Sequence, residues 1–123
     1  GELSRIMLAI KSILADEEGI ETLIFDEIDT GISGRTAQKV SERLACIAKK
    51  RQVIAITHLP QIAAMADAHY LIEKTSDSNS TISNIYLLTE EESIKELARM
   101  LGGVRITDAV LQNAREMRTL AKQ

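Results

Sequence analysis

Short apolar runs alternate with an amphipathic helical segment in the first half of the sequence, and this alternation limits the fold more than any other feature. Residues 22–25 and 52–57 have the length and composition expected of strands buried on both faces of a sheet. Between them, residues 35–50 place apolar side chains at helical spacing. Because parallel strands need such a crossover, the sequence predicts a mostly parallel sheet with crossover helices.

The rest of the chain adds a hairpin and further helices to this pattern. Residues 68–74 and 81–89 have the composition of strands, and the turn-forming residues 76–80 lie between them. These segments predict an antiparallel hairpin near the edge of the parallel sheet. We expect helices over residues 3–14, 60–66, 90–103 and 107–123. The chain is therefore expected to be an α/β protein.

Chemically active side chains follow both strands of the predicted parallel sheet. The first strand ends in Asp26 and Glu27, with Asp29 close behind, and the second ends in Thr57 and His58. Ligands of such sheets bind beyond the carboxyl ends of the strands. If the two strands are neighbours, this edge suits Mg²⁺-nucleotide chemistry. The aspartate holds the metal, the glutamate polarises an attacking water, and the histidine contacts the terminal phosphate.

Each of these groups also has a purely structural interpretation. Asp26 and Glu27 could be solvated residues at a strand end, without function. His58 could cap the turn before Pro60, and His69, inside a strand pattern, is interpreted as structural. The sequence alone leaves both interpretations open.

Composition argues against several classes of function. The net charge is −3 and aromatic residues make up 2% of the chain, which disfavours direct DNA binding by this segment. Cys46 is the single cysteine, so the chain cannot form an internal disulfide, which favours a reducing, cytoplasmic setting. No apolar stretch approaches the length of a membrane span.

Three motifs occur in the order in which they occur in ABC-type ATPases. Residues 1–5, Gly-Glu-Leu-Ser-Arg, resemble the tail of the ABC signature motif, residues 22–27 resemble the Walker B motif, and the strand ending at His58 resembles the switch-histidine loop. The sequence is similar to the carboxyl-terminal end of the RecN family over residues 1–15, 24–34 and 56–72. That family comprises SMC-like bacterial proteins of double-strand-break repair, and the resemblance covers essentially the whole chain.

The resemblance implies a role for each matching residue. Asp26 would hold Mg²⁺ directly or through a water, Glu27 would be the general base, and His58 would contact the γ-phosphate of ATP. Gly1 and Glu2 would be the last two signature residues, at the amino end of a helix whose dipole suits phosphate.

The segment after the Walker B motif is also implied to act in the site. Residues 28–33 would form the D-loop, which crosses the dimer interface in this family. Through this loop, Asp29 and Ser33 would take part in cofactor binding. Residues 32–33 are Ile-Ser where many ABC proteins have Leu-Asp, so this loop departs from the common pattern.

Parts of the family pattern do not occur in this sequence. The signature serine and first glycine are missing, and no Gly-x-x-x-x-Gly-Lys-Ser/Thr phosphate-binding loop is present. The resemblance therefore implies that residues 1–123 form the carboxyl-terminal lobe of a split ATPase head, without the Walker A lobe and the coiled coil.

The implied function is ATP hydrolysis in DNA double-strand-break repair and recombination, in the cytoplasm at the nucleoid and away from membranes. The implied cofactors are ATP and Mg²⁺, bound only with the amino-terminal lobe of the same protein. The other implied partners are a second head in an ATP-dependent dimer, and DNA, which is reached through the full-length protein. By itself the chain is expected to be inactive and to self-associate through uncovered apolar surface. The alternatives are a non-catalytic interaction or regulatory domain, or another SMC-like or ABC ATPase.

Overall fold

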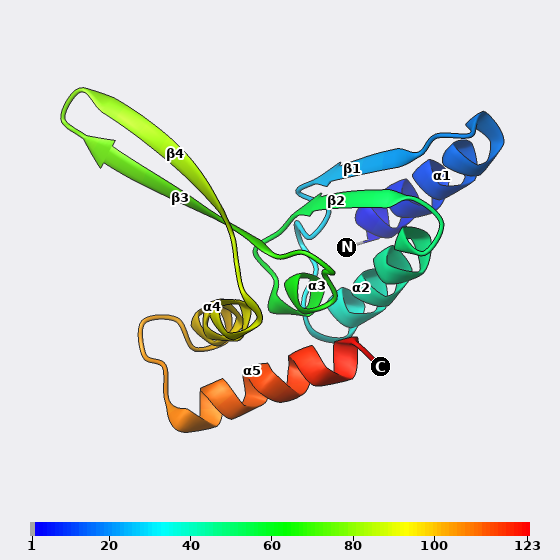
Figure 1. Cartoon of the computed structure of the whole chain (residues 1–123). Helices are drawn as coiled ribbons and strands as arrows, with labels where there is room; N and C mark the ends of the chain where they lie inside the picture. The colour runs from blue at the N-terminus through cyan, green and yellow to red at the C-terminus, as the bar shows by residue number, and fades with distance from the viewer. Residues whose placement is uncertain (1) are drawn as a thin grey trace. The chain divides into compact units, whose positions relative to one another are not determined.

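The computed structural model describes residues 2–123 and comprises two compact units (Figure 1). The first unit extends to Met65, and the second runs from Ala66 to Gln123. Gly1 lies outside the described residues, and so do the side chains of residues 2–4. Each unit is described by itself.

The first unit is built around a parallel pair of strands. Its elements are α1 (Glu2–Glu18), β1 (Thr22–Asp26), α2 (Gly34–Ala48), β2 (Gln52–Ile56) and α3 (Pro60–Ala64). β1 and β2 pair in parallel from Thr22 opposite Gln52 to Asp26 opposite Ile56, and α2 is the crossover between them. The expected parallel sheet with a crossover helix is thus confirmed.

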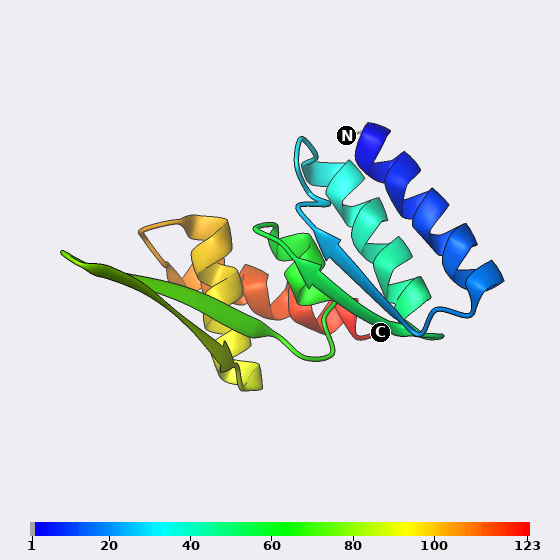
Figure 2. The ribbon, with the colours of Figure 1, turned by 90° about the horizontal axis from the view of Figure 1, so that it is seen from above.

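The core of the first unit lies between this sheet and two helices. Figures 1 and 2 show α1 and α2 side by side along one face of β1 and β2. The apolar stripe of α2 is buried as the sequence predicts, and α1 contributes Leu8 and Ala15. The buried cluster consists of Leu8, Ala15, Leu23, Phe25, Ile28, Ile32, Ala37, Val40, Leu44, Ile47 and Ile62. Burial of this apolar surface stabilises the β–α–β arrangement.

The opposite face of the parallel sheet is exposed. Ile24 is 59% exposed, Ile54 43% and Ile56 46%. The prediction that both strands are buried on both faces is therefore wrong for the described residues, because the two helices cover one face only. Helix α1 likewise presents apolar side chains, among them Ile6, at its surface. Burial in this unit is one-sided.

The second unit contains a hairpin and two helices. β3 (Tyr70–Asp77) and β4 (Ser80–Leu87) pair antiparallel around a two-residue turn, which confirms the predicted hairpin. Within residues 2–123 the hairpin forms its own sheet, so its strands do not extend the β1–β2 pair. Helix α4 (Glu90–Gly102) and helix α5 (Asp108–Ala121) follow.

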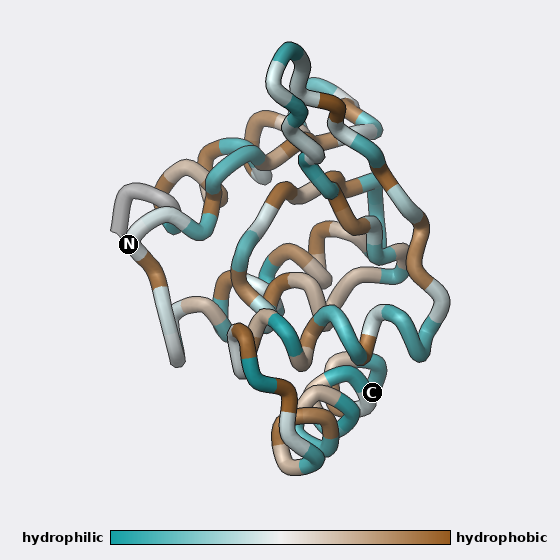
Figure 3. The backbone as a smooth tube through the Cα atoms, turned by 90° about the vertical axis from the view of Figure 1, so that its left-hand side faces the viewer, coloured by the Kyte–Doolittle hydropathy of each residue, from teal (hydrophilic) through white to brown (hydrophobic). Residues whose placement is uncertain are grey.

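Both helices of the second unit begin at threonine caps. The hydroxyl of Thr89 accepts a hydrogen bond from the Glu92 amide, and that of Thr107 accepts one from the Val110 amide, both at 3.3 Å. Figure 3 shows hydrophilic and hydrophobic residues alternating along the helical turns, as expected for elements that bury one side. The helices expected over residues 90–103 and 107–123 are therefore confirmed as α4 and α5.

Candidate functional site

The register of the parallel strands brings the predicted site residues to one edge. Asp26 and Ile56 are the last paired residues of β1 and β2. The segments that carry Glu27 and His58 therefore leave the sheet from neighbouring positions, as the sequence analysis required. The predicted site depends on this pairing, because only neighbouring strands bring their carboxyl ends together.

Glu27 adopts an unusual backbone conformation. Its φ is +55°, in the left-handed region that side chains other than glycine rarely occupy. Such a conformation costs about 1–2 kcal/mol. The amide of Thr30 donates to the Glu27 carbonyl at 3.2 Å, so the chain turns sharply at the strand end. Asp26 and Glu27 are both exposed, and strained residues of this kind concentrate at functional sites.

Asp29 lies below this surface. It is 2% exposed, and its Oδ2 atom accepts hydrogen bonds from the Thr57 hydroxyl at 2.6 Å and from the His58 amide at 2.8 Å. The Nδ1 atom of His58 lies 3.0 Å from the same oxygen. Asp29 therefore joins the segment after β1 to the segment after β2.

The surroundings of Asp29 favour its charged form. Burial, the largest influence, raises the pKa of Asp29. Hydrogen bonds from the Thr57 hydroxyl, the His58 amide and its own amide, with the nearby His58 ring, outweigh burial and hold the pKa below its usual value of 3.8. Asp29 is thus a carboxylate, and an acceptor only, at neutral pH.

His58 lies at the surface with one ring nitrogen turned inward. Its side chain is 74% exposed, although Nδ1 contacts Asp29. The amide of Leu59 donates to the Thr57 hydroxyl at 3.0 Å, which fixes the turn on the far side of His58. The ring is therefore attached at one edge and open to a ligand at the other.

The remaining predicted site residues are placed less completely. Ser33 is exposed at the N-cap of α2, where its backbone is extended and its side chain makes no capping hydrogen bond. Glu2 is the first residue of α1, while Gly1 lies outside the described residues. The roles of Gly1, Glu2 and Ser33 stay predictions.

The donor set at this edge fits Mg²⁺ of the kind held jointly with a nucleotide. In the part of the chain that the structure describes, no three His, Cys, Asp or Glu side chains gather as a metal site. Magnesium commonly takes one or two protein carboxylates and completes its shell with water and phosphate oxygens. An exposed Asp26 at a strand end meets that requirement.

Thr57 lies at a predicted strand end, but the sequence alone indicates no role for it. Its hydroxyl donates to Asp29 and accepts from the Leu59 amide. The one signal in the sequence is its position directly before His58 at the end of an apolar run. The contact joins residues 28 positions apart, so no local pattern shows it.

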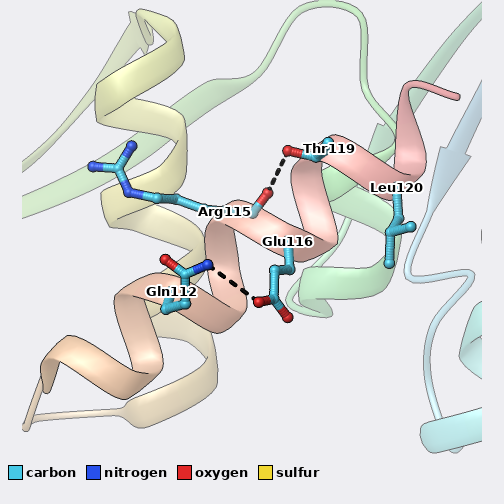
Figure 4. A pocket seen from close by; sticks show the side chains of 5 residues that line it. All are labelled: Gln112, Arg115, Glu116, Thr119 and Leu120. Carbon is cyan, nitrogen blue, oxygen red and sulfur yellow. Dashed lines mark hydrogen bonds between the residues drawn. The ribbon is translucent and has the colours of Figure 1, made fainter.

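The second unit holds none of these residues. His69 contacts the Ser93 hydroxyl at 2.7 Å, and burial, with the charge of Arg118, lowers its pKa although Glu96 opposes this. That environment agrees with the structural role expected for His69. A pocket on α5, shown in Figure 4, is lined by one helix through Gln112, Arg115, Glu116, Thr119 and Leu120.

Comparison with solved structures defines the class to which this fold belongs. An SMC ATPase, from work on ATP-driven dimerization and DNA-stimulated activation, matches 85% of this chain and 63% of its own with a TM-score of 0.65 and 22% identity. The chain therefore has the fold of an SMC ATPase, and the expected α/β class is confirmed. No protein-family model matches the chain.

Sequence comparison identifies the particular relatives as RecN DNA repair proteins. The protein from Halalkalibacterium halodurans is 45% identical over 121 residues, that from Bacillus subtilis 45% over 123, and that from Streptomyces coelicolor 42% over 122. These alignments cover 98%, 100% and 99% of this chain and 21% of each relative. The chain is homologous to RecN along its whole length and spans about a fifth of the length of these relatives.

One further property follows from the helices. None of those in residues 2–123 is long and apolar enough to cross a membrane.

Proposed function

We propose that this chain supplies one half of the ATP-hydrolysing site of an SMC-like DNA repair protein. The observation that carries the proposal is the pairing of β1 with β2. It lets the segment of Asp26 and Glu27 leave the sheet next to the segment of His58, which contacts the buried Asp29. The SMC ATPase fold and the RecN relatives support it independently. DNA repair is the setting that the names of these relatives suggest. Break repair and recombination, in the cytoplasm at the nucleoid, are the finer part of the proposal.

The exposed residues at this edge divide the chemistry among them. Glu27 orients the attacking water and accepts its proton. Asp26 would hold Mg²⁺, which when bound would neutralise charge on the phosphate oxygens. His58 donates a hydrogen bond to the terminal phosphate. Gly1, Glu2 and Ser33 complete the nucleotide contacts, across the interface between two heads.

The partners of this chain follow from what its sequence and surface leave incomplete. The sequence has no phosphate-binding loop, so the amino-terminal lobe of the same protein supplies the cradle and the lysine for the phosphates. The exposed face of Ile24, Ile54 and Ile56 is suited to apolar contact with that lobe. A second head and DNA are then partners of the complete protein.

The metal role is tested by Asp26→Asn in a complete RecN-type protein that contains this chain. We expect the substitution to raise the Mg²⁺ concentration needed for half-maximal ATP hydrolysis, because a carboxylate ligand is lost. Glu21→Gln is the matched control, since Glu21 is exposed before β1 and outside the proposed site. An unchanged Mg²⁺ requirement would remove Asp26 from the metal site.

A second candidate is a non-catalytic interaction domain. The one-sided burial of β1, β2 and α1 favours it, because bare apolar surfaces mark contacts with other proteins. The two candidates separate in a single assay. A complete protein of the second class would bind its partner without hydrolysing ATP, and Glu27→Gln would leave both properties unchanged.

A further inference from the structure

Asp29 stands out among the residues near the site because it is buried, charged and fully engaged. One oxygen, Oδ2, receives the Thr57 hydroxyl and the His58 amide, and it lies 3.0 Å from the ring nitrogen Nδ1. With 2% of its surface exposed, Asp29 is poorly placed to touch a nucleotide itself. Its contacts point instead to an effect on His58.

The chemistry of the contact fixes the state of the imidazole. An ionised carboxylate only accepts hydrogen bonds, so at 3.0 Å a proton on Nδ1 of His58 is favoured over a lone pair there. The partner of one ring nitrogen determines what the other nitrogen can do. In a neutral ring Nε2 then holds the lone pair, and only a protonated ring donates from both nitrogens. A hydrogen bond from Nε2 to a phosphate oxygen therefore requires a proton on both ring nitrogens.

Three contacts also restrict the position of the ring. The His58 amide bond to Asp29 holds the backbone, the Nδ1 contact holds the ring, and the Thr57 hydroxyl holds the carboxylate. Because the His58 side chain is 74% exposed, the surface around it imposes little other restraint. The orientation of the imidazole thus depends on Asp29.

We propose that Asp29, held by Thr57, is the positioning residue of His58: it fixes the proton on Nδ1 and turns Nε2 toward the nucleotide phosphate. This inference rests on the proposed ATPase function. It extends that function by giving a buried residue of the loop after β1 a defined task at the end of β2. Residues of this kind, which orient a reacting group without touching the substrate, typically change activity by about 10–100-fold when substituted.

The contact is tested in this chain without any nucleotide. Nitrogen-15 NMR in mildly alkaline buffer, where an ordinary imidazole is neutral, reports which ring nitrogen carries the proton. The chain has two histidines, so His69 serves as an internal control. We expect His58 to be protonated on Nδ1 in the parent chain and to lose that preference in Asp29→Ala, with His69 unchanged. A parent His58 protonated on Nε2, or one unaffected by the substitution, would overturn the proposal.

The consequence for the reaction is tested in a complete RecN-type protein. We expect Asp29→Asn to lower kcat by about 10–100-fold with a smaller effect on KM for ATP. In a His58→Ala background the same substitution should cause no additional loss, because a residue that acts through His58 has nothing left to position. Additive losses, or a kcat within twofold of the parent, would contradict the positioning role.

These measurements distinguish a failure of the proposed ATPase function from a failure of the positioning role of Asp29. If Glu27→Gln leaves turnover unchanged, the proposed function fails, whatever NMR shows for His58. If Glu27→Gln abolishes turnover but Asp29→Asn does not lower it, the function stands and the positioning role is wrong. Asp29→Asn keeps the size of the side chain, so the kinetic result does not depend on Asp29→Ala being well folded.

Discussion

Replacing Asp29 with alanine should destabilise the first unit more than any substitution of an exposed carboxylate. The Thr57 hydroxyl and the His58 amide would both lose a charged acceptor. Hydrogen bonds to charged groups contribute about 1.5–3 kcal/mol each, and water can replace part of that at the half-buried Thr57. We therefore expect the free energy of unfolding to fall by about 2–4 kcal/mol near neutral pH.

The effect should depend on pH in a defined direction. Asp29 has a folded pKa below its usual value of 3.8, so its contribution to stability is fully present above that value. As the pH falls further, the unfolded chain binds a proton before the folded chain does, and the contribution is lost through the folded pKa. The stability difference between the parent chain and Asp29→Ala should therefore shrink in acid.

Urea unfolding followed by circular dichroism, at neutral pH and at about pH 3, measures both quantities. Asp16→Ala is the matched control in the same unit, because Asp16 is exposed and pairs with Arg51 at the surface. The Arg51 side chain is largely buried, but the Asp16 carboxylate is exposed, so water screens the pair and we expect a loss of about 1 kcal/mol at most. A loss for Asp29→Ala no larger than that of Asp16→Ala, or a loss that stays constant between the two pH values, would show that the Asp29 carboxylate does not stabilise the first unit.

Three further predictions follow from the structure. Glu27→Asn should raise the free energy of unfolding by about 1 kcal/mol, because asparagine tolerates the left-handed backbone. The control Asp26→Asn should not raise it, and equal urea midpoints for the two variants would contradict this prediction. The isolated chain should self-associate through its bare apolar faces, and Ile54→Lys should reduce this in a light-scattering concentration series; a strictly monomeric parent chain would count against it. The isolated chain should hydrolyse no ATP above a buffer blank, since its sequence has no phosphate-binding loop, and turnover sensitive to Glu27→Gln would disprove that.

The elements of the fold could be predicted because their signals are local. The apolar run before Asp26 and the helical stripe of α2 each depend on spacing within a few residues, and the structure has both. The helices expected over residues 90–103 and 107–123 are also present, and Thr89 and Thr107 cap them. The hairpin also follows from local alternation and a turn.

Which surfaces are covered could not be predicted from the same signals. Ile24 belongs to a continuous apolar run, and such a run reads identically whether the covering layer comes from this chain or from another one. In α1 the apolar residues Ile6 and Ile10, which recur at helical spacing, are exposed, whereas Leu8 and Ala15 are buried. Periodicity shows that α1 is a helix, but this helix is apolar on more than one side.

The candidate site likewise has features that the sequence predicts and features that it does not. Asp26, Glu27 and His58 could be found because they end apolar runs. The left-handed backbone of Glu27 and the contact of Thr57 with Asp29 could not be found, since a torsion angle and a long-range hydrogen bond leave no local pattern. Both features depend on the folded chain, in which β1 pairs with β2.

The catalytic role of Glu27 is tested most directly by single-turnover ATP hydrolysis in a complete RecN-type protein carrying Glu27→Gln. Glutamine keeps the size of the side chain but cannot accept the proton of the attacking water. We predict that ATP binding is retained while the hydrolysis rate falls by about 10²–10⁴-fold. An unchanged hydrolysis rate would contradict the assignment of this chain as the catalytic half of an ATPase site.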